Sequence, residues 1–310
     1  MDWLCFFLLG ITLLLFSTHT LIKLAEKISR SLSVSPLIIG TTLVALGTSL
    51  PELMVSALAL LKHDAGLALG SIIGSNIVNI FLVLPVGILV GRLRVHSAKT
   101  QRNAFLLLGV TLLFILLRQF SLLPIFPGLL LLTLALVFTF GEYHFGVLGK
   151  TRKEEKLIKE DERGKITVGR ISSVILAAGG ITAGGILVVR SIENIALITG
   201  RSTTILGLSL AAIATSLPEL MATVFAQEDR QEEITLGNII GSNIYNLLFI
   251  GGLITLFSPA AVIPRQSWVW LVIATLCFVF ILRYFSGKTV PKFIGLSLFA
   301  FLGIYLFSLV

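Results

Sequence analysis

The chain consists of long apolar stretches separated by short polar connections. A helix that crosses a lipid bilayer needs about 20 mostly apolar residues, and stretches of that length recur from one end of the sequence to the other. We therefore expect ten membrane helices, at residues 3–22, 36–61, 66–91, 103–119, 122–141, 171–190, 203–226, 234–257, 266–284 and 291–309. No room remains between them for a large soluble domain.

The composition agrees with a chain that is buried in lipid. Apolar residues make up 55% of the sequence, charged residues make up 13%, and the mean hydropathy is +0.99. A water-soluble domain of 310 residues could not cover that much apolar surface with polar side chains. The sequence therefore predicts an all-α membrane protein that is embedded in the lipid bilayer.

The basic residues indicate which ends of the helices face the cytoplasm. Nineteen Lys and Arg fall in the connections after helices 1, 3, 5, 7 and 9, and five fall on the other side with the termini. Because Lys and Arg are enriched in cytoplasmic loops, we expect a multi-pass protein of the cell membrane with both termini outside. The net charge of +8 thus reflects orientation, and we expect no nucleic-acid partner because the basic residues are divided among short loops.

A 40-residue passage occurs twice, from Gly40 to Asn79 and from Gly207 to Asn246, at a constant offset of 167 with twenty identical positions. The identities concentrate in TSLPELM and IIGSNIxN. Each copy lies in a half of five expected helices, an odd number, so the two halves must cross the membrane in opposite senses, as in many secondary transporters. We expect two inverted five-helix repeats, 1–141 and 171–310, joined by a charged cytoplasmic linker, 142–170.

Two carboxylates lie deep within the expected helices. Of sixteen Asp and Glu, all but Glu52 and Glu219 lie in connections or close to helix ends. An ionised carboxylate at the middle of a membrane costs roughly 2.5–3.5 kcal/mol on insertion scales. Two of them at equivalent positions of a repeat predict a cation between them.

Each carboxylate follows a proline, Pro51 or Pro218. Proline has no N–H and its ring clashes with the carbonyl four residues earlier, so we expect the helices to open around residues 47–50 and 214–217 and to release backbone oxygens. Ser49 and Glu52 also have the spacing of a capping box, as do their equivalents in the second copy. The alternative is therefore that these residues only restart a broken helix.

The IIGSNIxN block supplies further oxygens. Ser75 and Asn79 are four residues apart and share one face of their helix, and their equivalents do the same. Thr48 lies one turn before Glu52, so both can face one cavity. Close helix packing is the better interpretation for a second group, which consists of Gly74, Gly241, Asn76 and Asn243.

These oxygens are typical ligands of a hard cation such as Ca²⁺, which takes six to eight of them. The motifs offer none of the His or Cys that zinc and copper prefer, and we expect no cofactor. An intramembrane enzyme would need a nucleophile–base pair or a metal motif such as H-E-x-x-H, which the sequence lacks. Uptake of an organic solute with sodium is a further alternative, although paired carboxylates with few mid-membrane aromatic residues favour bare cations.

The two blocks resemble the paired alpha-repeats of the sodium/calcium exchanger family, part of the calcium/cation antiporter superfamily, in its prokaryotic ten-helix form. The residues that carry the resemblance are GTSLPEL at 47–53, ATSLPEL at 214–220, GSNIVN at 74–79 and GSNIYN at 241–246, and the likeness extends over essentially the whole chain. It implies exchange of Ca²⁺ for Na⁺ by alternating access, with the ions between helices 2, 3, 7 and 8. The implied ligands are Glu52, Glu219, Thr48, Ser49, Ser75, Asn79, Thr215, Ser216, Ser242 and Asn246, with the carbonyls of Ala45 and Ala212.

One position departs from the family's pattern. Sodium/calcium exchangers often carry Asp where this chain has Asn246. Two carboxylates neutralise one Ca²⁺, two Na⁺ or two H⁺, so the sequence leaves the coupling ion and the stoichiometry open. Proton-coupled cation exchangers of the same superfamily are the alternative, although they usually carry a GN-x-x-E block where this chain has GSN.

The resemblance also implies that helices 1 and 6 slide across the ion-binding helices. Gly179, Gly180, Gly184 and Gly185 leave a smooth surface on helix 6. Small residues permit close packing without interlocking side chains. We expect this surface to slide during transport, and the alternative is tight static packing.

Overall fold

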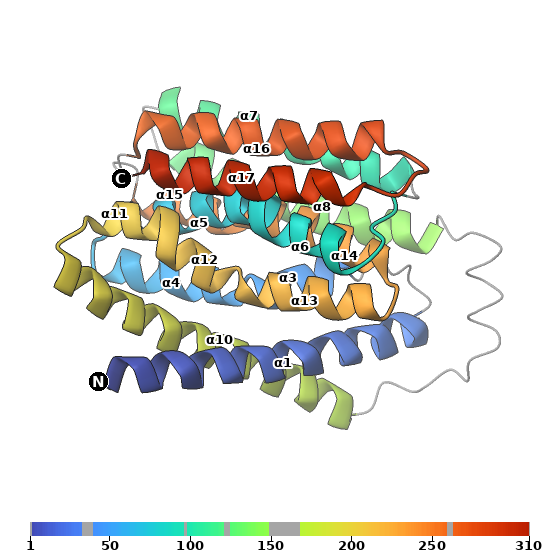
Figure 1. Ribbon diagram of the computed structural model, residues 1–310, viewed down its shortest axis with the longest axis horizontal. Coiled ribbons are helices and arrows are strands. Elements are labelled where there is room, and N and C mark those ends of the chain that lie inside the picture. Colours follow the sequence, from blue (N-terminus) through green and yellow to red (C-terminus); the bar gives the residue numbers. More distant parts are fainter. Residues whose placement is uncertain are drawn as a thin grey trace.

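The computed structural model describes residues 2–32, 40–95, 98–120, 125–148, 168–258 and 263–309. Helices make up nearly all of this part of the chain (Figure 1). Wherever the expected membrane segments are described, the chain there is helical apart from the short breaks at Ser49 and Ser216 and from single residues at segment ends, so the prediction of an all-α protein is confirmed. Most of the expected linker, 142–170, lies outside the described residues.

The first half begins with one long helix, α1. Two helical chains follow, and each contains a short π-helical stretch, labelled η. Two uninterrupted helices complete this half. The bounds are α1 Asp2–Leu32, η1 Gly40–Val44, α3 Ala45–Thr48, α4 Leu50–Leu61, α5 Ala65–Val78, η2 Asn79–Val83, α6 Leu84–Val90, α7 Ala98–Phe120 and α8 Ile125–Leu148.

The second half repeats this order of elements. A long helix again precedes two helical chains with π-helical stretches, and two uninterrupted helices follow. The bounds are α10 Val168–Thr199, α11 Thr203–Leu206, η3 Gly207–Ala211, α12 Ala212–Thr215, α13 Leu217–Glu228, α14 Glu232–Tyr245, η4 Asn246–Ile250, α15 Gly251–Phe257, α16 Arg265–Tyr284 and α17 Lys292–Ser308.

Several helices are long and apolar enough to cross a membrane. Six helices or helical chains in the described part meet this test, and α3–α4 would be a seventh if its halves, bent by 45°, form one span. Shorter apolar stretches lie within α1, α10 and α17. Together with the many exposed leucine and phenylalanine side chains, these helices make the chain a multi-pass membrane protein.

The helices form layers around a buried centre (Figure 1). α1 and α10 cross each other at one side of the molecule and pack against the layer that contains α4 and α13. α5 and α14 come next and are buried along most of their length. α7, α8, α16 and α17 complete the other side. The chains of the two halves run in opposite directions, and both ends of the described chain lie at the same end of the molecule.

Glycine allows the two halves to approach closely at the centre. A Cβ added to Gly74 would lie 2.6 Å from the carbonyl oxygen of Leu208, and one added to Gly241 would lie 2.6 Å from that of Thr41. Backbone cannot give way as a flexible side chain can, so any side chain at either position would push the halves apart. The prediction that Gly74 and Gly241 serve close packing is confirmed.

The glycines of α10 do not form one continuous surface. Gly180 and Gly184 pack against α1, where added Cβ atoms would meet Ser17 and the carbonyl of Gly10. Gly185 instead faces Pro51, at a Cβ distance of 2.7 Å. Gly179 has open space beside it, so its inclusion in the expected packing surface was wrong.

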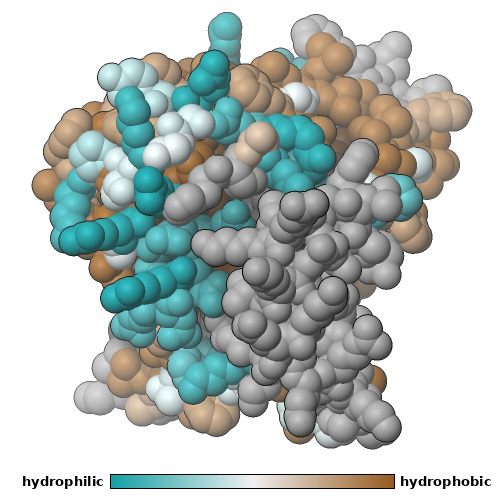
Figure 2. Space-filling view, turned by 90° about the vertical axis from the view of Figure 1, so that its right-hand side faces the viewer, coloured by the Kyte–Doolittle hydropathy of each residue, from teal (hydrophilic) through white to brown (hydrophobic). Residues whose placement is uncertain are grey.

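Polar residues gather at the end of the molecule that bears the connections α6–α7, α13–α14 and α16–α17 (Figure 2). A cavity of about 760 Å³ lies there, and charged side chains from all three connections line it. They include Arg92, Glu228, Arg230 and Lys292.

Candidate cation site

Both helices that carry the deep carboxylates are broken at a serine two residues before the proline. α3 gives way to α4 at Ser49, whose φ and ψ are −82° and 4°, and α12 gives way to α13 at Ser216, at −79° and 0°. Pro51 and Pro218 then occupy the first turns of α4 and α13, where a missing N–H is tolerated. The helix breaks expected from the sequence are confirmed.

The serines at these breaks do not form capping boxes. Neither Ser49 nor Ser216 makes a side-chain capping hydrogen bond to the helix that follows it. Ser49 Oγ instead donates to Oε1 of Glu219 in the other half of the molecule, at 3.4 Å. The alternative that these residues only restart a broken helix therefore fails for Ser49, because its hydroxyl serves a contact between the halves.

Glu52 is fully buried between the two halves. Its carboxyl group faces Ser75 and Thr215, whose hydroxyl oxygens are 3.1 Å apart, and it is close enough to Glu219 to interact with it electrostatically. Neither carboxyl oxygen of Glu52 has a hydrogen-bond partner among the described residues. A buried carboxylate without a hydrogen-bond partner is costly, and a bound cation would offset that cost.

Glu219 has the equivalent surroundings in the second half. It is fully buried and accepts a hydrogen bond from Ser242 Oγ at 3.3 Å, in addition to the one from Ser49. Its neighbour from the other half is Thr48, whose Oγ1 lies 3.4 Å from Ser242 Oγ. Each carboxylate thus faces the serine of its own half and the threonine of the other.

Asn79 and Asn246 begin the π-helical stretches η2 and η4. Such wide turns are rare and occur frequently at functional sites. Asn79 Nδ2 donates to Asn243 Oδ1 at 2.9 Å, which leaves Asn79 Oδ1 without a partner in the described part of the chain, and neither amide atom of Asn246 has one there. Asn243 Nδ2 donates to the Asn76 carbonyl at 3.2 Å, in line with the packing role expected for Asn243.

The carbonyls of Ala45 and Ala212 already take part in hydrogen bonds within their own helices. Ala45 accepts from the Ser49 N–H at 3.0 Å and from Thr48 Oγ1 at 3.3 Å. Ala212 accepts the equivalent bonds in the second half, at 3.0 Å and 3.4 Å. Each of these oxygens already accepts two hydrogen bonds. It can coordinate an ion if it binds the ion and the donors at the same time, or if the donors move away.

Most of the buried polar side chains without a partner in the described part of the chain lie in the two copies of the repeated passage. Each such buried atom costs free energy unless something binds it. Within the described ranges, those in the two repeated passages belong to Glu52, Ser56, Ser71, Asn76, Asn79, Ser216, Glu219, Thr223 and Asn246. Most of them are oxygens, so their arrangement fits a bare cation better than an organic solute.

Asn238 belongs to the same cluster, although sequence reasoning did not identify it. Its Oδ1 lies 3.1 Å from Thr48 Oγ1, whose single hydrogen can bond to it in place of the Ala45 carbonyl, and its Nδ2 donates to the Glu219 carbonyl at 3.5 Å. The available signal was its position one turn before Ser242 within an apolar run, with a polar residue, Ser71, at the equivalent place in the first copy.

Broken membrane helices that meet around a buried, oxygen-lined cluster are typical of secondary transporters. A comparison with known families gives the class more narrowly. The family model described as "Sodium/calcium exchanger protein" matches residues 3–143 and 171–310, and the chain belongs to this family. The protein is therefore a cation antiporter and not an enzyme.

Relatives and solved structures agree with this assignment. A protein named CaxA from Alkalimonas amylolytica is 34% identical over an alignment of 311 positions, gaps included. The alignment covers 96% of each chain. The sodium/calcium exchanger MaX1 from Methanosarcina acetivorans is 28% identical over 82% of this chain and 83% of its own. Among solved structures, the sodium-calcium exchanger NCX_Mj soaked with Na⁺ and Sr²⁺ matches with a TM-score of 0.79 and 29% identity, over 99% of this chain and 98% of that one.

Proposed function

We propose that the protein exchanges Ca²⁺ for Na⁺ across the cell membrane by alternating access. The observation that carries this proposal is the pair of fully buried carboxylates, Glu52 and Glu219, brought together from two halves that run in opposite directions. Both ions bind in the space between the helical chains η1–α4, α5–α6, α11–α13 and α14–α15. The ligands are the twelve residues named from the sequence, of which Ala45 and Ala212 contribute carbonyl oxygens.

The chemistry of the site supports calcium as one substrate. Ca²⁺ prefers carboxylate, hydroxyl, amide and carbonyl oxygens, and these surround Glu52 and Glu219. Among the described residues, no group of three or more His, Cys, Asp and Glu forms a site of another type. Two carboxylates supply the charge that one Ca²⁺ requires.

The same two carboxylates explain how one ion is exchanged for another. One Ca²⁺ or two Na⁺ neutralise Glu52 and Glu219, so the occupied site is electrically balanced with either ion. Two kinds of ion that compete for one site cannot occupy it together, and each must leave before the other binds. The family description and the names of MaX1 and NCX_Mj favour Na⁺ over H⁺ as the coupling ion.

The arrangement of the helices supports ten spans in two inverted five-helix repeats, residues 1–141 and 171–310. The two ends of the described chain lie at one end of the molecule, as an even number of crossings requires. The opposite end bears the charged connections after the third, seventh and ninth spans. In our proposal this polar end and the linker 142–170 face the cytoplasm, and both termini lie outside.

Calcium flux under two different gradients tests this function. Protein reconstituted into liposomes that are loaded with Na⁺ should take up ⁴⁵Ca²⁺ when diluted into Na⁺-free buffer, because outward movement of Na⁺ provides the driving force. A pH gradient of equal size should drive no uptake above that of protein-free liposomes. If only the pH gradient drives uptake, the coupling ion is H⁺ and not Na⁺. If neither gradient drives uptake, the protein is not a calcium antiporter.

A further inference from the structure

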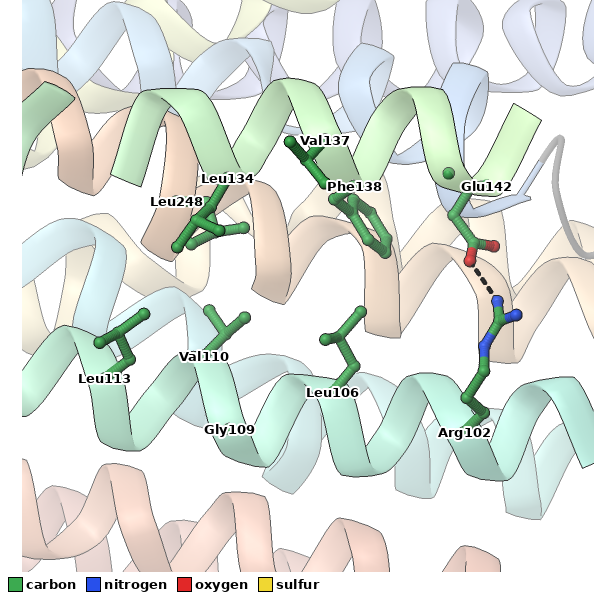
Figure 3. Close-up of a pocket in the computed structure, with 11 residues that line it drawn as sticks. Arg102, Leu106, Gly109, Val110, Leu113, Leu134, Val137, Phe138, Glu142 and Leu248 are labelled. Carbon is green, nitrogen blue, oxygen red and sulfur yellow. Dashed lines mark hydrogen bonds and ion pairs between the residues drawn. The ribbon is translucent and has the colours of Figure 1, made fainter. Parts of the chain in front are cut away.

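An apolar groove runs along the outside of the molecule between α7 and α8 (Figure 3). Its volume is about 440 Å³. Side chains from the two helices point toward each other across it, and a residue of η4 lies at its floor. The side chains used below are Leu106, Val110 and Leu113 of α7, Leu134 and Phe138 of α8, and Leu248 of η4.

The groove opens toward the hydrocarbon of the bilayer. The outer faces of α7 and α8 beside it are apolar and exposed, with Leu112 and Leu116 on α7 and Leu136 and Phe140 on α8. Away from its charged end, an apolar space of this kind has no polar atoms to hold water. In a membrane, the molecules available to fill it are lipid chains.

A charged pair closes one end of the groove. Arg102 of α7 reaches across to Glu142 of α8 (Figure 3). Glu142 is almost fully buried and also accepts hydrogen bonds from Asn103 Nδ2 at 3.0 Å and from Thr41 Oγ1 at 3.4 Å. The side chain of Arg102 is 45% exposed, so the basic member of the pair faces outward.

This end of the groove lies where lipid headgroups would be. Arg102 is in the second turn of α7, and the apolar span of α8 ends at Glu142. A second basic residue, Lys99, lies one turn before Arg102 on the same helix. Arg102 and Lys99 face one acidic residue, Glu142, so this end of the helix pair carries a net positive charge.

We propose that the groove binds one acyl chain of an anionic phospholipid, with the lipid phosphate at Arg102. A groove that is apolar along its length and basic at its headgroup end matches such a lipid in both parts. Basic pockets between membrane helices are known to hold anionic headgroups. This proposal rests on the protein's place in a membrane and not on which ions it exchanges.

The lipid would lie directly against a helix of the ion site. Leu248, at the floor of the groove, is two residues after Asn246 in the π-helical stretch η4. Phe138 in the wall stacks edge-on against Tyr245, with ring centres 5.6 Å apart. Occupancy of the groove would thus support the segment that presents Asn246 to the cation.

Glycines in open space provide a matched pair of variants. A Cβ added to Gly109, in the groove, meets nothing within 4 Å, and the same holds for Gly303 on the exposed surface of α17. Gly109→Phe should fill the groove without disturbing the fold, whereas Gly303→Phe adds the same ring elsewhere on the lipid-facing surface. Differences between the two variants therefore report on the groove.

The test measures thermal unfolding of the full-length protein in detergent during titration with lipid. Phosphatidylglycerol should stabilise the unmodified protein at about fivefold lower concentration than phosphatidylcholine with the same chains, as expected for one basic contact to an anionic headgroup. Gly109→Phe should lose this difference, and Gly303→Phe should keep it. Inorganic phosphate should give no stabilisation at the same concentrations.

Three outcomes would overturn the proposal. If the two lipids stabilise the unmodified protein at the same concentration, an anionic headgroup is not recognised at Arg102. Equal behaviour of Gly109→Phe and Gly303→Phe would place the lipid outside the groove. If inorganic phosphate stabilises the protein as much as phosphatidylglycerol does, the acyl chain does not contribute to binding.

Discussion

Replacement of Glu52 by Gln is expected to abolish calcium transport, and Glu219→Gln is expected to do the same. Each carboxylate supplies half of the negative charge that balances Ca²⁺. At an effective dielectric constant of about 20, a unit charge 4 Å from another contributes roughly 4 kcal/mol, which is about a thousandfold in an equilibrium constant. The measurement is ⁴⁵Ca²⁺ uptake by reconstituted protein under a Na⁺ gradient, normalised to the amount of folded protein.

Glutamine keeps the size of the side chain, so both variants should fold and insert into the membrane. Glu228→Gln is the matched control, because Glu228 is exposed at the end of α13 and far along the helix from its break. It should transport at the rate of the unmodified protein. Near-normal uptake by either Glu52→Gln or Glu219→Gln would contradict a site shared by the two carboxylates.

The second large effect is expected at Gly185, where α10 meets the helix break in the first half. A side chain there would collide with Pro51, because even a Cβ atom would lie 2.7 Å from the proline ring. If α1 and α10 move across the broken helices during transport, Gly185→Leu should slow turnover by tenfold or more, whereas equilibrium binding of ⁴⁵Ca²⁺ per folded molecule should be retained. Gly185→Ala should give a smaller loss of the same kind.

Gly179 provides the control for this prediction. It lies on the same helix with open space beside it, so Gly179→Leu should leave turnover and binding unchanged. Equal losses of turnover and of binding in Gly185→Leu would instead indicate static packing that holds the site together. A series of variants at Gly184 would report on a different contact, the one between α10 and α1.

The sequence predicts the chemistry of the site better than its geometry. Pro51 and Pro218 force helix breaks wherever the chain is helical, because neither can donate the hydrogen bond that the helix needs. Glu52 and Glu219 stand out because charge is costly in lipid. Both signals come from single residues and can be recognised without knowledge of the fold. The breaks and the pair of buried carboxylates could therefore be predicted.

Features that depend on contacts between the halves could not be predicted in this way. The π-helical stretches begin at Gly40, Asn79, Gly207 and Asn246, the four ends of the repeated passage, yet nothing in their composition distinguishes them from α-helix. The role of Asn238 depends on Thr48, a residue 190 positions away that only the packing of α14 on α3 brings near.

Helix lengths were underestimated for a physical reason. We expected the first helix at 3–22 and the sixth at 171–190, but α1 extends to Leu32 and α10 covers Val168–Thr199. Apolar residues mark the part of a helix that lies in hydrocarbon. Both helices continue past charged residues, Lys23 and Glu26 in α1 and Arg190 and Glu193 in α10, where hydropathy no longer distinguishes helix from connection.

The central claim is that one cation binds between Glu52 and Glu219, and anomalous diffraction tests it most directly. Sr²⁺ is a heavier analogue of Ca²⁺ whose position can be located in a crystal by its anomalous scattering. Crystals of the protein soaked with Sr²⁺ should give a strong peak in contact with carboxyl oxygens of both residues, and the peak should weaken as Na⁺ is added. A peak that contacts only one carboxylate, or one that Na⁺ does not displace, would contradict the shared site.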